Sequence, residues 1–513
     1  MRSEPAIVLG LLAGLSFSAA QPAHATIGTL DEVPAATLLL PYFEVDPADP
    51  LGVTTLFTVR NASAGPVVAH VTVWSNLSVP VLDFDVYLTG YDSQTLNLRD
   101  VFVEGNLPVT APDDAFSPRG PRSKPHDDFG GSCDLFLPYT NPALPVSLRQ
   151  HFQAWLTGQG SPLPFFFGEC AGVATENLAG YITIDAVNFC NLDFPSAPGY
   201  FQPGGTGIAS NRNVLWGEWL IADPGNNFAQ GDALVHIEAS GDDPLTSTPG
   251  NRTFYGRYVG GSAADNREPL SSTWHASLGG GALSGGETEL LVWRDSGILQ
   301  TSFPCGALPA PFPLATGNSV VYDPDGAATP FPSDALPWET QRLSALPAGS
   351  GLDLDLDAST GSLFDPDQQG HVTVIHSGSG LFSTGTGAVQ GEPGALGTAD
   401  AAPGASLLLP YFEVDPADPA LRTTAATVHN ASSDPVLARA VLWTDLGVPT
   451  LGFDLHLPGH GSRVVDLGEL FGAGTLPASG PADLPGCAGR LPPAPVSAAG
   501  LEELRAAHAG AAS

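Results

Sequence analysis

The sequence predicts an all-β protein built of tandem β-sandwich modules with a minor share of helix. Three observations support this fold class: short alternating strands, frequent chain breakers, and an internal repeat. The chain of 513 residues contains 60 Gly and 49 Pro, and both residue types interrupt helices and form turns. Hydrophobic residues make up 43% of the chain, which is enough to build cores. The length suggests two to four domains.

Alternation of apolar and polar residues defines the strands. Residues 55–74 alternate on both sides of turn residues at 61–65, which predicts two strands joined by a short connection. Residues 81–98 predict two more strands around a bend at 90–93. Helices are expected only at 146–158 and 499–510, and strands at this spacing favour sandwiches over alternating α/β units. Further strands are predicted at 180–189, 234–239, 288–295, 318–323, 351–357 and 371–378.

The repeat is exact over thirteen residues, because LLLPYFEVDPADP occurs at both 38–50 and 407–419. The same shift of 369 positions (407 minus 38) aligns residues 36–108 with 405–477 without a gap. The likeness ends after roughly the first third of the first copy. We interpret this pattern as a duplicated unit whose second copy is partial.

The order of a strand, an Asn-Ala-Ser turn at 61–63 and the strand PVVAHVTVW resembles immunoglobulin-like modules of bacterial surface proteins. This resemblance implies a fold and no activity. The stretches LLPYFEVD, FDVYLTGYDSQTLNLRDVF and NVLWGEWLIADPGNNFAQGDALVHIEA also resemble uncharacterised secreted bacterial β-rich proteins. The predicted regions are an export signal at 1–25, a first β-rich region at 26–260 that includes an immunoglobulin-like module at 26–110, a second β-rich domain at 261–395, a linker at 396–404, and a partial repeat of the first module at 405–513.

Charge and the N-terminal residues indicate where the protein acts. The 18 basic and 53 acidic residues give a net charge of −35, which repels phosphate backbones and anionic lipids and argues against nucleic-acid and membrane-surface partners. Arg2, the apolar stretch at 6–20 and the Ala-His-Ala at 23–25 predict an export signal. No later run approaches the ~20 apolar residues that span a bilayer. We therefore expect no membrane insertion, and a secreted or periplasmic protein with an unknown protein or glycan partner.

Five cysteines are an odd number for an exported protein. The partial repeat explains this number, since Cys487 corresponds to Cys133 and a counterpart of Cys170 would lie past Ser513. The other four cysteines allow three pairings. We favour the disulfides Cys133–Cys170 and Cys190–Cys305, because the first closes a local loop around the expected helix. A thiolate metal site is the alternative, and it lacks any C-x-x-C pair.

Two acidic turns are candidates for calcium, the one candidate cofactor. Asp323 and Asp325 lie in a DPDG sequence, and Asp365 and Asp367 in a DPD sequence. Calcium loops take several oxygen ligands from a short turn. Neither sequence has the full D-x-D-x-D-G pattern with a distant Glu, and a plain β-turn is the simpler interpretation. The DLDLD at 353–357 places three carboxylates on one strand face, which an amphipathic edge strand also explains.

The strongest candidate for chemistry is the segment 215–239, which carries aromatic residues beside carboxylates. A sugar-cleaving site needs a stacking platform, an acid, and a nucleophile or base. The alternative is a core-facing tryptophan pair on a solvated strand. No nucleophile-elbow, zinc-protease or P-loop motif is present in the sequence. The candidate ligand-binding residues are Trp216, Glu218, Trp219, Asp223 and Glu238.

Comparison of the two copies shows which residues they share. No histidine of one copy meets a histidine of the other: His70 faces Arg439, for example. Glu44 and Asp46 are kept and share one strand face, which suits either a cation site or solvent-facing acids; we favour the latter. We therefore predict a structural or interaction role outside the cytoplasm, with a carbohydrate-active enzyme or carbohydrate-binding module as the alternative. The shared pairs are Glu44/Glu413, Asp46/Asp415, Asp49/Asp418, Asn61/Asn430, Trp74/Trp443 and Asp85/Asp454.

Overall fold

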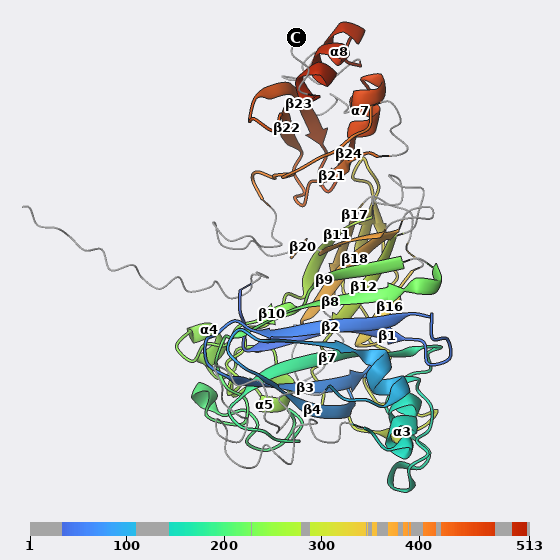
Figure 1. Cartoon of the computed structure of the whole chain (residues 1–513), viewed down its shortest axis with the longest axis vertical. Coiled ribbons are helices and arrows are strands. Elements are labelled where there is room, and N and C mark those ends of the chain that lie inside the picture. Colours follow the sequence, from blue (N-terminus) through green and yellow to red (C-terminus); the bar gives the residue numbers. More distant parts are fainter. Residues whose placement is uncertain are drawn as a thin grey trace, which may run out of the picture.

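The chain folds into antiparallel sheets with few helices, which confirms the all-β class (Figure 1). The predicted export signal, almost all of the predicted linker, and Cys133, Cys487, Asp365 and Asp367 lie outside the residues that the structure describes. The computed structural model describes residues 33–108, 143–226, 228–278, 288–344, 346, 351–356, 368–377, 383–387, 389–390, 404–416, 422–477 and 495–509.

Two packed sheets form the first unit of the molecule. One sheet has the strand order β10-β1-β7-β3-β4, and the other has the order β5-β2-β8-β9. The strands are β1 (Thr37–Val45), β2 (Thr54–Asn61), β3 (Val67–Ser75), β4 (Pro80–Leu88), β5 (Ser93–Asn97), β7 (Leu178–Val187), β8 (Leu215–Asp223), β9 (Phe228–Ala233) and β10 (Val235–Ile237).

The core of this unit lies between its two sheets. Leu38 and Leu40 of β1 pack there with Phe57 of β2 and Ile221 of β8, since alternate side chains of a strand share one face. The π-helix η1 (Asp100–Glu104) and the helix α3 (Val146–Leu156) close one end, with Trp155 of α3 in the same core. The prediction of a helix at 146–158 is thereby confirmed.

Strand β7 is buried over its whole length, because both faces of its sheet are covered. One face meets the core between the sheets, and the other meets a cluster that includes Trp74, Tyr181 and Phe254. The first unit therefore takes strands from residues 178–237 as well as from 37–97. The predicted boundary at residue 110 does not close a sheet, because β3 needs β7, and β2 needs β8, as its neighbour.

A second unit also consists of two packed sheets, with the strand orders β15-β14-β17-β11-β20 and β16-β12-β18-β19. Trp274, Leu290 and Leu352 belong to the core between them, whereas Leu291 points from the other face of β12 into the core of the first unit. The strands are β11 (Thr273–Ser277), β12 (Thr288–Arg294), β14 (Val320–Tyr322), β15 (Ala328–Pro330), β16 (Thr340–Leu343), β17 (Gly351–Asp355), β18 (Gly370–Ser377), β19 (Ser383–Gly387) and β20 (Val389–Gln390).

Short elements connect these two units. Strand β6 (Glu169–Cys170) pairs with β13 (Phe303–Pro304) in a two-stranded sheet of its own. The helix α5 (Gly256–Val259) lies against the covered face of the first sheet, where Tyr258 packs against Trp74. The other helices described in this part of the chain are η2 (Pro164–Phe166), η3 (Pro203–Gly205), η4 (Pro224–Asn226) and α4 (Pro244–Ser247).

The C-terminal unit stands at the opposite end of the molecule from the first unit (Figure 1). Strand β21 (Ala425–His429) pairs with β24 (Ser462–Asp466), and β22 (Val436–Trp443) pairs with β23 (Pro449–Leu457). These pairs correspond to β2–β5 and β3–β4 of the first unit. The helices α7 (Leu467–Ala473) and α8 (Ala498–His508) pack on the same small core.

The shared asparagine of the repeat has the same structural role in both units. Asn61 donates its side-chain Nδ2 hydrogens to the carbonyls of Gly65 (2.6 Å) and Thr89 (2.9 Å). Asn430 donates in the same way to Asp434 (2.7 Å) and Pro458 (2.9 Å). The Asn-Ala-Ser sequence therefore recurs because its amide closes the turn between two strands.

Candidate functional site

The two tryptophans of β8 face opposite ways. Trp219 is buried in the core and donates its indole N–H to the carbonyl of Ala233 at 3.1 Å. Trp216 lies on the other face of the strand, half-buried beneath the guanidinium of Arg60, which is 4.7 Å from the ring centre. The two indole rings therefore do not form one stacking platform for a sugar.

The three candidate carboxylates are spread along β8. Glu218 binds the guanidinium of Arg60 at 2.5 Å. Asp223 follows five residues later, about 17 Å along an extended strand, and accepts from the side chain of Asn226 at 2.7 Å. Glu238 lies beyond the other end of β8, where it accepts from Asn213 at 3.3 Å. Sugar-cleaving carboxylates stand about 5–9.5 Å apart, so β8 does not bring Glu218 and Asp223 together as such a pair.

The acidic turn at Asp323 closes on itself. One carboxylate oxygen of Asp323 accepts from the backbone N–H groups of Asp325 (2.9 Å) and Ala327 (2.8 Å). The carboxylate of Asp325 accepts from Arg463 of the C-terminal unit at 3.2 Å. The two backbone bonds to Asp323 are those of a β-turn. In the described part of the chain, no three His, Cys, Asp or Glu side chains are grouped to hold a metal ion.

The acids of the repeated thirteen-residue stretch are bonded within the protein. The Glu44 carboxylate accepts from Asn177 at 2.6 Å and from Arg342 at 3.2 Å. Asp46 accepts from the backbone N–H groups of Ala48 (2.7 Å) and Asp49 (3.1 Å), and so holds the turn after β1. Both acids therefore have structural partners.

The predicted cysteine pairing is wrong. Cys170 forms a disulfide with Cys305, with an S–S distance of 2.08 Å, which excludes both Cys133–Cys170 and Cys190–Cys305. The reason is the pairing of β6 with β13, which brings residues 135 positions apart to the same place. Cys190 is disulfide-bonded as well. The predicted pairing was chosen because it closes a short loop. The observed disulfide is instead determined by the pairing of two strands that are far apart in the sequence.

A buried polar network fills the covered face of the first sheet, and the sequence analysis did not identify it as a unit. Asp185 of β7 accepts from Thr37 at 2.5 Å and from the hydroxyls of Tyr200 and Tyr255 at 3.0 Å each. Arg267 donates to the hydroxyl of Thr37 at 3.0 Å. Buried hydroxyls and charges of this kind are retained where each has a partner.

His70 and Asp85 form a buried pair beside this network. The Nδ1 atom of His70 lies 2.8 Å from Asp85, whose other oxygen accepts from the backbone of Asn191 at 2.8 Å. Burial opposes protonation of His70, but the hydrogen bond and charge of Asp85 outweigh it and raise the pKa of the imidazole. In the C-terminal unit the same cross-strand pair is Arg439 and Asp454.

That substitution explains why His70 itself does not recur in the repeat. The position opposite the shared aspartate keeps a basic side chain and changes its kind from imidazole to guanidinium. An imidazole used as a catalytic base could not be exchanged for an always-charged guanidinium. The basic side chain of the pair therefore neutralises the aspartate in the middle of the neighbouring strand. In the sequence, this role is indicated by the exchange of His70 for Arg439 opposite the shared Asp85 and Asp454.

A cluster of histidines lies where the C-terminal unit meets the second unit. His460 stacks on Tyr322 of β14, with ring centres 4.4 Å apart, and its Nδ1 lies 3.5 Å from Asp353 of β17. His275 of β11 contacts the other oxygen of Asp353. His429 of β21 lies beside them and is partly buried. Burial lowers the pKa of His429 to about 4. The charges of His275 and His460 lower this pKa as well, whereas the carboxylate of Asp353 raises it.

We expect acidification to weaken this contact. An undocked His429 regains its usual pKa of 6.5, so the undocked state binds more protons between the two pKa values. Because of this linkage, docking of the C-terminal unit on the second unit is strongest above the higher of the two pKa values. It weakens as the pH falls from about 7 to about 4.5. Small-angle scattering should show the radius of gyration rising over this range. The variant His429→Phe should show a smaller rise, and compaction on acidification would contradict the expectation.

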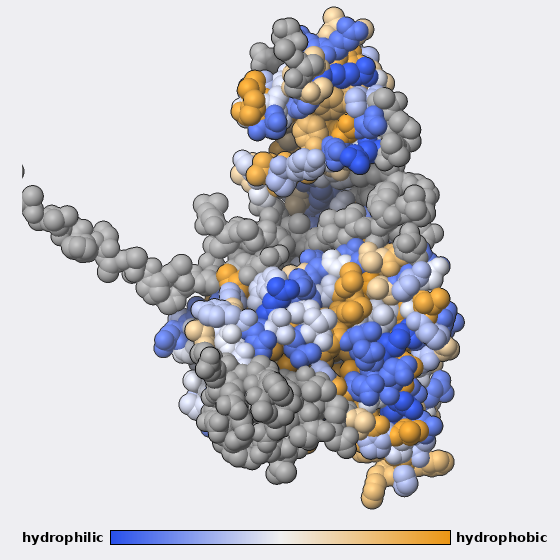
Figure 2. Space-filling view, in the orientation of Figure 1, coloured by the Kyte–Doolittle hydropathy of each residue, from blue (hydrophilic) through white to orange (hydrophobic). Residues whose placement is uncertain are grey.

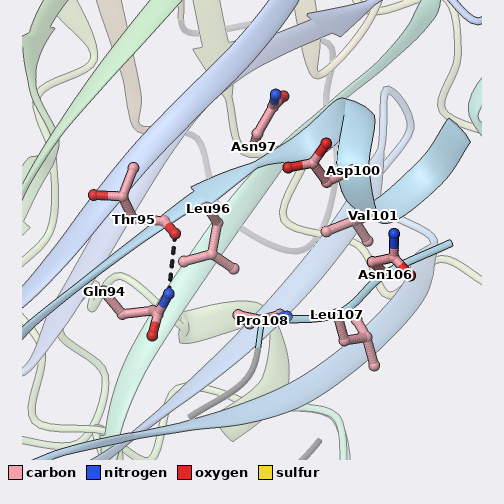
Figure 3. A pocket seen from close by; sticks show the side chains of 9 residues that line it. All are labelled: Gln94, Thr95, Leu96, Asn97, Asp100, Val101, Asn106, Leu107 and Pro108. Carbon is pink, nitrogen blue, oxygen red and sulfur yellow. Dashed lines mark hydrogen bonds between the residues drawn. The ribbon is translucent and has the colours of Figure 1, made fainter. Parts of the chain in front are cut away.

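A shallow hollow of about 310 Å³ lies beside β5 and η1 (Figure 3). Its lining holds one carboxylate, that of Asp100, and no imidazole or thiol among the nine residues drawn. Gln94 donates to the carbonyl of its neighbour Thr95 at 3.1 Å. The lining ends at Pro108, after which residues 109–142 fall outside the described chain. The described lining therefore supplies no acid–base pair.

Several large apolar side chains of the C-terminal unit are exposed. Figure 2 shows hydrophobic residues on the surface of this unit. We name the exposed apolar side chains of residues 407–411 and of β22 together the open face. The side chains that form it are Leu407, Leu408, Leu409, Tyr411, Leu437, Val441 and Trp443.

In comparisons with known proteins, no family model, curated sequence or solved structure matches the chain. Among the described helices, none is both long and apolar enough to cross a bilayer. The function of the protein is therefore inferred from its own residues, and above all from the open face.

Proposed function

We propose that this protein is an exported acidic protein of tandem immunoglobulin-like β-sandwich modules with an interaction role outside the cytoplasm. The first and second units form a continuous packed body, to which Leu291 contributes from one unit to the core of the other. The C-terminal unit is attached to the end of that body through contacts such as Arg463 with Asp325. This arrangement suits a scaffold that presents its last unit to a partner.

The exposure of the open face carries this proposal. Leu408 is 85% exposed, whereas its counterpart Leu39 is fully buried. Trp443 is 52% exposed, whereas Trp74 is 1% exposed. An exposed set of large apolar side chains on a water-soluble unit marks a surface that another molecule covers. The repeat strengthens the inference, because the same residue types serve as core when their neighbours are present.

The net charge of −35 supports the same role, because it keeps the chain soluble despite the exposed apolar side chains. It also favours partners that are not themselves polyanions. The export signal predicted from residues 1–25 supports an interaction in the periplasm or outside the cell.

Site-specific photo-crosslinking in the producing cell tests the proposal. A benzophenone amino acid at Leu408 should yield an adduct of discrete mass. The control position is Phe165, which is also exposed but belongs to the first unit. An insertion at Trp216 tests the carbohydrate alternative, since a bound glycan would be captured there. The proposal fails if Leu408 gives no adduct, or the same adducts as Phe165.

A further inference from the structure

Three consecutive phenylalanines lie at the surface of the first unit. Phe165 is 95% exposed, Phe167 is 79% exposed and Phe166 is 38% exposed. They belong to residues 161–168, SPLPFFFG, which we name the phenylalanine loop. Single exposed apolar side chains are normal on a protein surface, but a contiguous group of large ones marks a place where another molecule binds.

The phenylalanine loop protrudes from one end of the molecule. It follows α3 in the chain, and Figure 1 shows this part of the chain beyond α3, at the end farthest from the C-terminal unit. Figure 2 shows hydrophobic residues at the same end. A flat surface that approaches this end of the molecule therefore meets the loop first.

Internal hydrogen bonds hold the loop in shape. The N–H of Gly168 donates to the carbonyl of Ser161 at 3.3 Å, and the N–H of Phe166 donates to the carbonyl of Leu163 at 3.0 Å. The hydroxyl of Ser161 accepts from the N–H of Leu163 at 3.1 Å and lies 2.7 Å from Nδ1 of His151 on α3. Because Ser161 is the one polar side chain of the loop, the side chains that the loop exposes are apolar.

Phe166 attaches the loop to α3. Its ring stacks on His151 with centres 5.4 Å apart, and meets the ring of Trp155 edge-on at 5.1 Å. The pairing of β6 with β13, together with the disulfide beside it, fixes the end of the loop to the second unit. The rings of Phe165 and Phe167 are therefore held in water by an ordered loop. A group that is ordered before binding loses little conformational freedom when it binds.

Charged residues are absent from the sequence around the loop. None lies between Arg149 and Glu169, or between Asp295 and Asp323, the stretch that contains β13. Of the 513 residues 71 are charged (18 plus 53), so these 46 residues (19 plus 27) would hold about six at the average density. Arg149 donates to two carbonyls of η1 at 2.9 Å, and Glu169 accepts from Ser302. The loop therefore carries no part of the net charge of −35.

We propose that the phenylalanine loop is a lipid-contact site, which inserts Phe165 and Phe167 into the interfacial region of a zwitterionic phospholipid bilayer. Aromatic side chains prefer this region, and apolar side chains bind there in proportion to the area that they bury. The insertion is shallow and involves no spanning segment. This contact lies at the opposite end of the molecule from the open face and is independent of it.

A bilayer suits the loop better than a partner protein does. Stable protein interfaces bury about 800 Å² on each side and contain about ten hydrogen bonds. The loop presents two rings, and its one polar side chain, Ser161, already has partners within the protein. A lipid interface requires no directional bond from the rings that enter it.

The kind of lipid follows from charge. Segments that bind anionic membranes combine apolar side chains with Lys or Arg, and none lies between Arg149 and Arg212 or between Arg294 and Arg342. The net charge of −35 repels anionic lipids, which is why the sequence predicts no membrane-surface partner. A zwitterionic surface has no net charge, and salt screens the rest of the molecule beyond about 8 Å. The repulsion therefore does not apply to such a surface.

Vesicle binding tests the proposal. The full-length protein is mixed with sucrose-loaded vesicles of phosphatidylcholine, and the bound fraction is measured after sedimentation. Binding should rise with lipid concentration and change little between low and high salt, because no charge contributes to it. Vesicles that also contain phosphatidylglycerol should bind less protein at low salt, since the acidic chain is repelled from them.

A double variant tests the role of the two rings. Phe165→Ser with Phe167→Ser should lower the partition coefficient by about tenfold or more, because the apolar area that enters the interface is lost. Both rings are exposed, so this variant should melt like the parent protein. The matched control is Leu51→Ser with Leu245→Ser, which removes two exposed leucines outside the loop and should bind vesicles as the parent does.

Photo-crosslinking identifies the contact directly. A benzophenone amino acid at position 165, irradiated with vesicles, should add the mass of one phospholipid. Absence of vesicle binding by the parent would overturn the proposal. Equal binding by the double phenylalanine variant would also overturn it, and would assign lipid contact to another surface such as the open face. A protein adduct at position 165 in the producing cell, without a lipid adduct from vesicles, would assign the loop to a partner protein and reject the bilayer. The adduct expected at Leu408 is a separate result, so either proposal can fail while the other stands.

Discussion

Trp74→Ala should lower the free energy of unfolding of the first unit by about 3–5 kcal/mol, the usual cost of removing a fully buried tryptophan. The ring is 1% exposed and lies between Tyr181 and Tyr258, with centres 5.8 Å from each. Its indole N–H also donates to Thr183, so the substitution leaves a cavity and removes one hydrogen bond of a buried hydroxyl. Urea denaturation followed by circular dichroism measures the loss.

The repeat provides the matched control. Trp443→Ala changes the same residue at the same position of the second copy, where the ring is 52% exposed. Surface substitutions usually stay within about 0.5 kcal/mol, so this variant should melt like the parent protein. A large cost at Trp443 would show that the open face is covered in the isolated protein, and would remove the basis of the interaction role.

Elements of the fold were predictable from local pattern. Alternation predicted strands within 55–74 and 81–98, and helices were expected at 146–158 and 499–510. The structure contains strands at 54–61, 67–75 and 80–88 and helices at 146–156 and 498–508. These features depend on neighbours in sequence, where side-chain direction follows from periodicity.

Pairing between distant segments was not predictable in this way. The partner of β3 is β7, more than a hundred residues away, and the partner of Cys170 is Cys305 for the same kind of reason. The positions of Trp216 and Trp219, in contrast, were predictable, because a spacing of three residues along a strand places two side chains on opposite faces. The sequence contained that information, although the candidate sugar site did not use it.

The open face combines both kinds of information. The alignment of 36–108 with 405–477 gave the equivalent residues, but only the pairing of β7 with β1 and β3 showed which of them need a neighbour. The sequence therefore predicts a buried side chain for residues such as Leu407, whereas the structure shows it exposed.

Arg257→Met should cost about 3–5 kcal/mol of stability, because it leaves two buried carboxylates without their cation. Arg257 of α5 donates to both oxygens of Glu339 at 3.1–3.2 Å and also contacts Asp295. All three side chains are buried where the first unit meets the second. Burial raises the pKa of Glu339, and removal of the guanidinium, which opposes that rise, should raise it further.

This mechanism has a pH signature and a rescue. A carboxyl whose pKa is raised in the folded state binds protons more readily than in the unfolded state, so the penalty of Arg257→Met should shrink as the pH falls. Adding Glu339→Gln and Asp295→Asn removes the unpaired charges and should restore most of the stability at neutral pH. Arg422→Met, which breaks only the exposed pair with Glu413, should leave the denaturation curve unchanged. If the triple variant is as unstable as Arg257→Met alone, the loss comes from packing of the arginine stem rather than from the buried charges.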